Sequence, residues 1–250
     1  MKAGVSGKGR GDFGTRFYVW LKGILDRVLA LVILVVLSPL LALIALAVRV
    51  DSPGNPIFSQ ERVGKSGRLF RVYKFRSMYA NNDDSKFKAF LRKFVQDNAS
   101  SQLDEDGRDV YELVNDPRIT RIGALLRRTN IDEIPQLVNV LKGEMALIGP
   151  RPEIPFTVEM YQPQHRQRLL CKPGITGLWQ VSHRREVSFE DMVKLDIDYM
   201  RHQSLLLDAK IAFLTVYEPF RRDHRKSILK QSGQSGPAEP GRSSQGPEQH

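Results

Sequence analysis

The chain has 250 residues and a formal net charge of +10, which comes from 38 lysine and arginine residues against 28 acidic ones. That length accommodates one substantial domain with attachments. The basic excess suits a negatively charged partner, namely nucleic acid, anionic lipid or a phosphorylated substrate. The single cysteine, Cys171, excludes an intramolecular disulfide framework and fits a reducing compartment.

The N-terminal region combines a polar start with a long apolar stretch. Residues 1–16 are rich in glycine and basic residues, which predicts a disordered, basic N-terminus. Val28 to Val48 is almost wholly apolar and long enough to cross a bilayer as one helix. Ser38-Pro39 interrupts this run, because proline removes a backbone hydrogen bond. Basic residues flank the run on both sides, against the positive-inside tendency of a simple span. We therefore favour a helix–break–helix over 17–50 that enters and leaves on one face, with a single span as the alternative.

Residues 51–78 follow the apolar stretch. Residues 51–68 are rich in proline, glycine and asparagine, which indicates loop and turn. Leu69 to Met78 alternates well enough to predict a strand or extended segment. In a strand, Lys74 and Arg76 share one face. Two cations there suit a phosphate group, and a solvated basic face is the alternative.

Two amphipathic segments and a polar tail complete the outline. Residues 83–96 are predicted to form a basic amphipathic helix that lies in the membrane interface or packs on the core, the second being slightly favoured. A polar loop is expected over 98–109. Residues 205–216 are apolar but contain Asp208 and Lys210, so they are interpreted as an interfacial or docking helix rather than a span. Residues 223–250 are predicted to be a basic and then disordered tail.

The most informative stretch contains the adjacent acids Asp132 and Glu133. Asn130 with Glu133 three residues later matches a capping box. Pro135 fits a first helical turn, and Gly143 fits a C-terminal stop. Both acids are therefore predicted at a helix N-terminus, where the dipole favours negative charge and keeps an aspartate ionised. Ordinary first-turn acids have the same pattern, and the spacing alone favours that interpretation.

Arg151 lies between two prolines in Gly149-Pro150-Arg151-Pro152. Its restricted backbone suits recognition of a diphosphate or a planar base, because the guanidinium hydrogen-bonds with its fork and stacks with its face. A turn arginine that caps carbonyl groups is an equally good interpretation. The second strand-like run is Leu178-Trp179-Gln180-Val181.

The sequence has no Cys/His zinc spacing, serine nucleophile elbow, dinucleotide-binding or P-loop pattern. An acid pair, several arginines and a membrane anchor remain, and this set suits phosphoryl chemistry. In that chemistry a carboxylate can act as the nucleophile on phosphorus. A diphosphate substrate would bring Mg²⁺ with it.

Several blocks in order resemble the bacterial sugar transferases, the monotopic polyprenyl-phosphate phosphoglycosyl transferases. The resemblance runs from Val19 to Phe220, and long ordered blocks are more specific than any single motif. At His183 the family usually has glycine, so this loop departs from the pattern. The matching blocks are Ser52-Pro53-Gly54, Gln60-Glu61-Arg62-Val63-Gly64, Lys74-Phe75-Arg76-Ser77-Met78, Asp132-Glu133-Ile134-Pro135-Gln136, Lys142-Gly143-Glu144-Met145, Gly149-Pro150-Arg151-Pro152 and Lys172-Pro173-Gly174-Ile175-Thr176-Gly177.

The resemblance implies an α/β, mostly α, fold with a re-entrant membrane helix-hairpin broken at Ser38-Pro39 and with interfacial amphipathic helices. It implies a catalytic domain over 51–222 on the cytoplasmic face of the bacterial inner membrane. The implied reaction moves a sugar 1-phosphate from a UDP-sugar to polyprenyl (undecaprenyl) phosphate through a covalent aspartyl intermediate. UMP is released, and the step starts surface glycan or exopolysaccharide synthesis.

Carried over residue by residue, the resemblance makes Asp132 the nucleophile. Glu133 binds Mg²⁺, together with Asp132, or assists proton transfer. The residues expected to bind phosphate or nucleotide in the same site are Arg127, Arg151, Lys74, Arg76, Arg184 and Asp208. Expected partners are a UDP-sugar, polyprenyl phosphate, anionic membrane lipids and a possible second copy, with no nucleic acid. A membrane-tethered basic binding protein without catalysis, or a Mg²⁺-dependent phosphatase, are the other interpretations, and the sequence does not identify the sugar.

Overall fold

The structure is a computed structural model in which the chain divides into two compact units, Met1–Thr215 and Val216–His250. Nearly all described residues belong to the first unit. The predicted disordered tail over 223–250 and most of the predicted disordered N-terminus lie outside the described residues, although Asp12 to Arg16 are helical rather than disordered. The described residues are 12–79, 83–98, 102–103, 109–110, 116–182 and 188–217.

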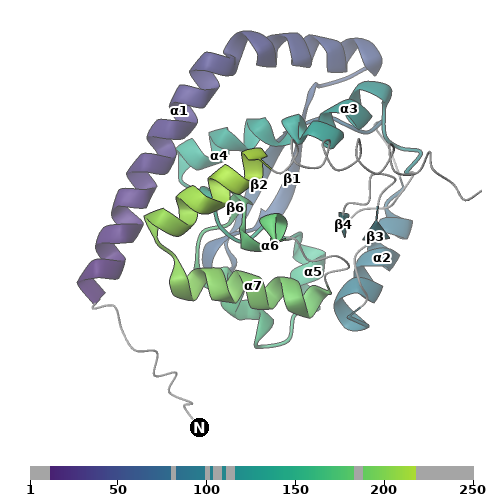
Figure 1. The fold of residues 1–250 in the computed structure, drawn as a ribbon. Helices are drawn as coiled ribbons and strands as arrows, with labels where there is room; N and C mark the ends of the chain where they lie inside the picture. The colour runs from purple at the N-terminus through teal and green to yellow at the C-terminus, as the bar shows by residue number, and fades with distance from the viewer. Residues whose placement is uncertain are drawn as a thin grey trace, which may run out of the picture. The chain divides into compact units, whose positions relative to one another are not determined.

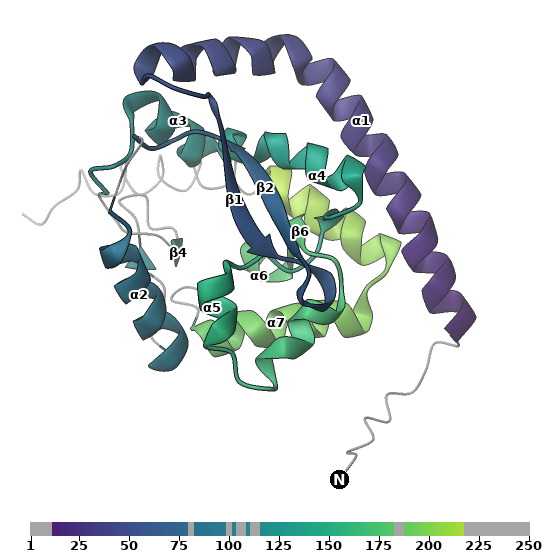
Figure 2. The ribbon, with the colours of Figure 1, turned by 180° about the vertical axis from the view of Figure 1, so that it is seen from behind.

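Helix α1 (Asp12–Asp51) is a single helix of 40 residues with Pro39 inside it. It is bent part-way along (Figures 1 and 2), as expected for a helix that contains proline. The Ser38 hydroxyl donates to the Val35 carbonyl at 2.8 Å. The predicted helix–break–helix is therefore a bend in a continuous helix, because the loss of one backbone hydrogen bond at Pro39 does not end it.

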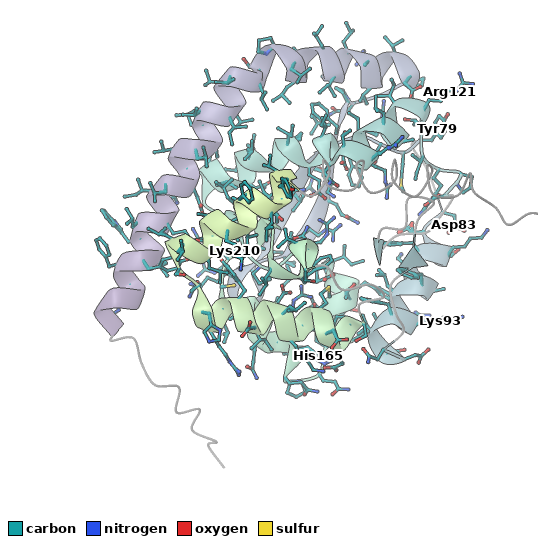
Figure 3. All side chains as sticks on the ribbon, viewed as in Figure 1. Tyr79, Asp83, Lys93, Arg121, His165 and Lys210 are labelled. Carbon is teal, nitrogen blue, oxygen red and sulfur yellow. The ribbon has the colours of Figure 1, made fainter. Side chains whose placement is uncertain are left out.

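The surface of α1 is largely apolar and exposed. Within the described residues, Arg16–Asp51 is the one helical stretch long and apolar enough to cross a membrane. Side chains stand out from it on the side away from the other elements (Figure 3). Trp20 is 62% exposed and Val36 is 68% exposed. Such a continuous exposed apolar surface needs a partner that excludes water.

Three small sheets occur among the residues that the structure describes. Strands β1 (Ile57–Val63) and β2 (Leu69–Phe75) pair antiparallel, with Phe58 opposite Lys74. A 3₁₀ turn, η1 (Lys65–Gly67), joins them. Strands β5 (Ala146–Ile148) and β6 (Gly174–Thr176) are parallel neighbours, and β3 (Gln102–Leu103) pairs with β4 (Asp109–Val110).

The predicted strand over 69–78 is confirmed as far as Phe75, and three other local predictions are wrong. Residues 57–63 were expected to be loop, but they pair along their whole length with β2, whose backbone supplies their hydrogen bonds. Leu178–Val181 was expected to be strand-like and is instead a helical turn, α6. Gly177 is extended before that turn, and both Trp179 and Val181 are buried by it. β3 likewise lies within the expected 98–109 loop.

The remaining elements are helical, so the mostly α fold is confirmed. The basic amphipathic helix α2 (Ser85–Gln96) packs on the core, as was slightly favoured. Its Phe94 ring meets Phe189 edge-on at 5.7 Å, and both lie in one buried cluster with Trp179. The other helices are α3 (Arg121–Thr129), η2 (Ile131–Gln136), α4 (Leu137–Lys142), α5 (Pro155–Glu159), η3 (His165–Leu170), α7 (Phe189–His202) and a final helix over 205–217.

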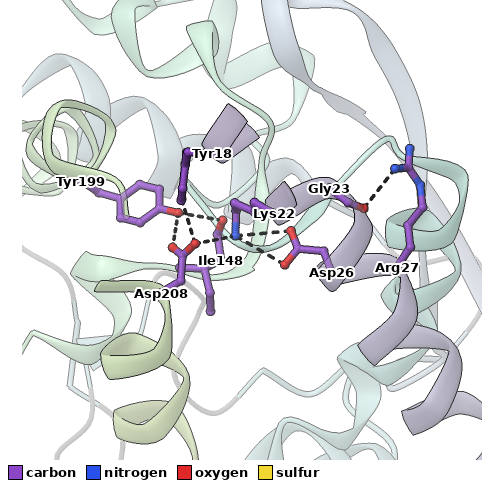
Figure 4. A network of polar contacts seen from close by, with 8 residues as sticks. All are labelled: Tyr18, Lys22, Gly23, Asp26, Arg27, Ile148, Tyr199 and Asp208. Atoms are coloured by element: carbon purple, nitrogen blue, oxygen red, sulfur yellow. Dashed lines mark hydrogen bonds and ion pairs between the residues drawn. The ribbon is translucent and has the colours of Figure 1, made fainter. Parts of the chain in front are cut away.

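Both ends of α1 contact the same compact unit. Near its start, Asp208 Oδ2 accepts a hydrogen bond from the Tyr18 hydroxyl at 2.8 Å and lies 3.0 Å from Lys22 Nζ (Figure 4). At its other end, the Asp51 carboxylate accepts from the Ile122 N–H at 3.0 Å. Between these ends the inner face of α1 also packs on the unit, since Ala30 lies in one buried cluster with Val140 and Val48 lies in another with Leu126.

Candidate active site

The two acids lie on η2, a 3₁₀ helix between α3 and α4. Asn130 ends α3 in the left-handed conformation, with φ of 56°, which asparagine tolerates better than most residues. Its side chain makes no capping hydrogen bond, so the predicted capping box is wrong. Pro135 lies inside η2 rather than in a first α-helical turn. The prediction for Gly143 is confirmed, because it closes α4 with φ of 78°.

Glu133 is held by two cations from different parts of the chain. Its Oε1 atom lies 2.7 Å from Lys74 Nζ on β2 and 2.8 Å from Arg151 Nη2. Arg151 Nη1 also donates to Oε2, at 3.4 Å. Burial alone would raise the pKa of Glu133, but Arg151 and Lys74 together hold that pKa well below its usual range. Glu133 is therefore ionised at neutral pH.

Asp132 has the opposite environment although it is the adjacent residue. It is 7% exposed, and burial raises the pKa of its carboxyl group against the opposing effect of Lys74. The expectation that a helix N-terminus keeps this aspartate readily ionised is therefore not met. Among the described residues none donates a hydrogen bond to the Asp132 carboxylate, whereas Glu133 accepts three. Neighbouring acids whose pKa values are pushed apart are a frequent sign of divided catalytic roles.

Two further arginines add positive charge at the acid pair. Arg127, at the end of α3, is partly buried, which lowers its pKa while Asp132 opposes the change. Arg62 on β1 donates to the Pro152 carbonyl at 3.1 Å. Burial and the charge of Arg151 lower the pKa of Arg62 to about 10. Arg62 was not among the predicted site residues, although it lies in the Gln60–Gly64 block that carried the family resemblance.

The structure does not bring every predicted residue to this place. Arg76 follows the end of β2 and is buried, and its guanidinium donates to the carbonyls of Ser52 and Pro53 at 2.5 and 2.8 Å. It therefore holds the chain after α1, and it does not share a face with Lys74, since the strand ends at Phe75. Arg184 and His183 lie outside the described residues.

Asp208 is also placed elsewhere. It is buried, and it accepts hydrogen bonds from the hydroxyls of Tyr199 at 2.6 Å and Tyr18 (Figure 4). Its described contacts reach α1 and α7 and none of the residues around Asp132. The structure thus does not place Asp208 in the phosphate or nucleotide site where the resemblance put it, because its carboxylate is buried against Tyr18, Lys22 and Tyr199 instead.

The comparison with known families settles which group the chain resembles. Residues 17–222 match the family described as "Bacterial sugar transferase". The chain belongs to this family.

Two of the relatives compared with this bacterial sugar transferase have names that describe transfer to a lipid carrier, and one is named for exopolysaccharide production. This chain is 43% identical over 206 residues to a UDP-galactose-lipid carrier transferase of Erwinia amylovora, and the matched stretch covers 82% of this chain and 41% of that relative. It is 37% identical over 191 residues to the exopolysaccharide production protein ExoY of Sinorhizobium fredii, at 76% and 81% coverage. It is 40% identical over 207 residues to an undecaprenyl-phosphate galactose phosphotransferase of Salmonella typhimurium, at 82% and 41% coverage. The matched part thus spans about two fifths of the first and third relatives.

The donor atoms of this sugar transferase site limit the metals it can hold. No cluster of three or more His, Cys, Asp or Glu side chains suited to a metal ion occurs among the described residues. Mg²⁺ is commonly bound through one or two carboxylates with substrate phosphates and water completing the shell. Asp132 and Glu133 fit that requirement in number, and Asp132 has the less occupied oxygens.

Proposed function

We propose that this sugar transferase moves a sugar 1-phosphate from a UDP-sugar to undecaprenyl phosphate and releases UMP. The step would begin the membrane stage of surface glycan or exopolysaccharide synthesis. The names of the relatives support the lipid acceptor and the pathway class. The observation that carries the proposal is the contrast within the acid pair. The negative charge of Glu133 is balanced by ion pairs with Lys74 and Arg151, while no described residue donates a hydrogen bond to the buried Asp132.

The chemistry is proposed to run in two displacements at one phosphorus atom. A carboxylate oxygen of Asp132 attacks the β-phosphorus of the UDP-sugar, and the bond from that phosphorus to the bridging oxygen breaks, so UMP leaves. A phosphate oxygen of undecaprenyl phosphate then attacks the same phosphorus and displaces Asp132. A covalent intermediate divides one difficult transfer into two easier steps.

The cations around Asp132 support this chemistry. Lys74, Arg127 and Arg151 all act electrostatically on Asp132, and Arg62 lies beside Arg151. Phosphoryl transfer depends mainly on positioning and on stabilising the charge of the phosphate oxygens. Mg²⁺ bound with the diphosphate, through Asp132 or Glu133, would neutralise part of the same charge.

The membrane arrangement is proposed from the two ends of α1. Because Asp208 contacts the start of this helix and Ile122 contacts its end, a path across the bilayer would separate residues that meet on one compact unit. We therefore infer a re-entrant helix in the inner membrane with the catalytic unit on the cytoplasmic face. That placement brings the acid pair to the same surface as the phosphate of a lipid carrier.

The test is to trap the intermediate with a UDP-sugar carrying ³²P at the β-phosphate. Purified wild-type protein without acceptor should release about one equivalent of UMP in a burst and retain the label on the peptide that contains Asp132. Addition of undecaprenyl phosphate should transfer the label to lipid, whereas a phosphatase would release it as free sugar phosphate. An active preparation with sequential kinetics and no label at Asp132 would overturn the covalent mechanism.

A further inference from the structure

The loop that carries Arg151 is fixed by hydrogen bonds on both sides, three between backbone groups and one from the Arg62 side chain. The contacts come from β1 and from β6, two elements far apart in the sequence. They are Gly149 N–H to the Thr176 carbonyl at 2.9 Å, Gly174 N–H to the Pro150 carbonyl at 2.8 Å, Arg62 to the Pro152 carbonyl at 3.1 Å, and Val63 N–H to the Glu153 carbonyl at 2.8 Å. Arg151 itself is reached by a side chain, Arg168, whose Nη2 donates to the Arg151 carbonyl at 3.4 Å.

Arg168 is a buried cation that the proposed reaction does not use. It lies on η3 and is 2% exposed. Its Nη1 atom donates to the Tyr161 hydroxyl at 2.7 Å and to Glu153 Oε1 at 3.0 Å. Its Nη2 atom lies 2.5 Å from Asp196 Oδ2 on α7, and Asp196 is 1% exposed. One guanidinium therefore joins the Arg151 loop to the segment after α5 and to α7.

A contribution to stability does not by itself explain why this buried ion pair is present. The desolvation of a buried ion pair offsets much of its attraction, and apolar residues of similar volume often stabilise a core as well or better. A planar guanidinium with five N–H donors instead fixes the direction of each group that it contacts. Three of its four partners stand on different segments: Glu153 follows the loop, Tyr161 follows α5 and Asp196 lies on α7.

We propose that Arg168 is a positioning residue that holds the Arg151 backbone so that the Arg151 side chain lies against Glu133. The path has two hydrogen bonds: Arg168 Nη2 to the Arg151 carbonyl, and Arg151 Nη2 to Glu133 Oε1 at 2.8 Å. Asp196 supplies the counter-charge that keeps Arg168 in place. The inference deepens the proposed function, because it rests on Arg151 and Glu133 belonging to the nucleotide-binding part of the site.

A double-mutant cycle tests the coupling between Arg168 and Arg151. Arg168→Lys keeps the charge but cannot hold Asp196, Glu153 and the Arg151 carbonyl at once. We expect a KM for the UDP-sugar raised about tenfold, corresponding to about 1.4 kcal/mol, with a smaller change in kcat. If Arg168 acts through Arg151, the KM of the double variant Arg151→Lys/Arg168→Lys should not exceed the KM of the more impaired single variant.

His165→Gln is the matched control. His165 lies on the same 3₁₀ helix and is 1% exposed, and its Nε2 lies 2.7 Å from Glu190 Oε1. Among the described residues its polar contacts are with Gln162 and Glu190 and not with the Arg151 loop. His165→Gln should lower the melting temperature. In the double variant with Arg151→Lys, the two fold-changes in KM should multiply, as expected for independent sites. Multiplicative effects for Arg168→Lys as well would overturn the positioning role.

UDP binding by calorimetry gives a readout that does not need turnover. Wild type that binds no UDP would count against the proposed function itself. Wild type that binds UDP, with Arg168→Lys and Arg151→Lys losing affinity independently, would count against the positioning role alone. If Arg168→Lys does not fold, Glu153→Gln removes one partner of Arg168 and takes its place in the same cycle, with the same two outcomes.

Discussion

Arg151 Nη2 lies 2.8 Å from Glu133 Oε1, and Arg151 Nη1 approaches Glu133 Oε2 at 3.4 Å. Both nitrogens of the guanidinium fork therefore meet both oxygens of one carboxylate. This two-point contact fixes orientation as well as charge. Arg151, for which the sequence suggested a nucleotide contact, therefore also holds Glu133 of the acid pair in place.

Arg151→Lys should weaken use of the UDP-sugar although the positive charge is kept. Lysine cannot reproduce the two-point contact with Glu133, and one hydrogen bond to a charged group is worth about 1.5–3 kcal/mol. We expect kcat/KM to fall by about ten- to a hundredfold. Steady-state kinetics with Arg68→Lys, an exposed arginine in the turn before β2, as the control would check this. Unchanged kinetics would leave Arg151 without a role in the site.

Glu133→Gln should destabilise the protein as well as impair turnover. It leaves Lys74 and Arg151 without their shared counter-charge, and loss of one member of a fully buried pair costs about 3–5 kcal/mol. Arg151 keeps 27% of its side chain exposed, so we expect about 2 kcal/mol here, below that range, because solvent screens the cation.

The pH dependence of that loss has a defined sign. Because the pKa of Glu133 is lowered on folding, its contribution is complete above the unfolded pKa of about 4.3 and is lost as pH falls through the folded value. The difference in unfolding free energy between wild type and Glu133→Gln should therefore shrink below about pH 4.3. Denaturant unfolding in detergent with EDTA measures it, with the exposed Glu159→Gln as the control. A difference independent of pH would show that the ion pairs do not stabilise the fold.

Asp132→Asn should abolish labelling and turnover while leaving the fold intact or slightly more stable. Burial raises the pKa of Asp132, which means that the folded protein disfavours the charge that the proposed reaction needs. Asparagine keeps the shape and removes that cost. We expect a melting temperature equal to or above that of wild type, with no UMP burst. A clear loss of stability would instead identify Asp132 as a structural ion-pair partner.

Local signals in the sequence predicted the elements whose structure depends on local chemistry. Gly143 ends α4 because the left-handed conformation there favours glycine. The stripe of phenylalanines on α2 faces the core, where Phe94 contacts Phe189. The acid pair, Lys74, Arg127 and Arg151 were all expected in one site, and the structure brings them together.

The sequence did not predict which distant segments would contact each other. Asp208 meets Tyr18, 190 residues earlier in the chain, and a charged residue in an apolar helix does not specify which cation or hydroxyl it will find. Arg76 turns to carbonyls at the end of α1 because β2 ends one residue before it. Asn130 was interpreted as a cap of the following helix, but it closes the preceding one, because both roles suit the same side chain.

The path of α1 leads to a labelling prediction. If both ends of the helix are cytoplasmic, single cysteines at Lys8 and at Ser66 should both be protected from an impermeant maleimide in intact cells. Both should react after lysis. Burial raises the pKa of Cys171 to about 12, which makes its thiol unreactive, and Cys171→Ser removes any remaining background. Labelling of position 8 but not position 66 in intact cells would restore a simple span.

Two substitutions should shift this topology in a direction that follows from the contacts. Pro39→Ala restores the missing backbone hydrogen bond and favours a straight helix, which is long enough to span. Asp208→Asn weakens the contact with Lys22 that returns the start of α1 to the domain (Figure 4). The double variant should therefore expose position 8 to the impermeant reagent in a larger fraction of molecules than either single variant. Asp198→Asn, which changes an exposed acid on α7, is the control for loss of charge. Full protection of position 8 in the double variant would show that neither the bend nor Asp208 determines how the helix enters the membrane.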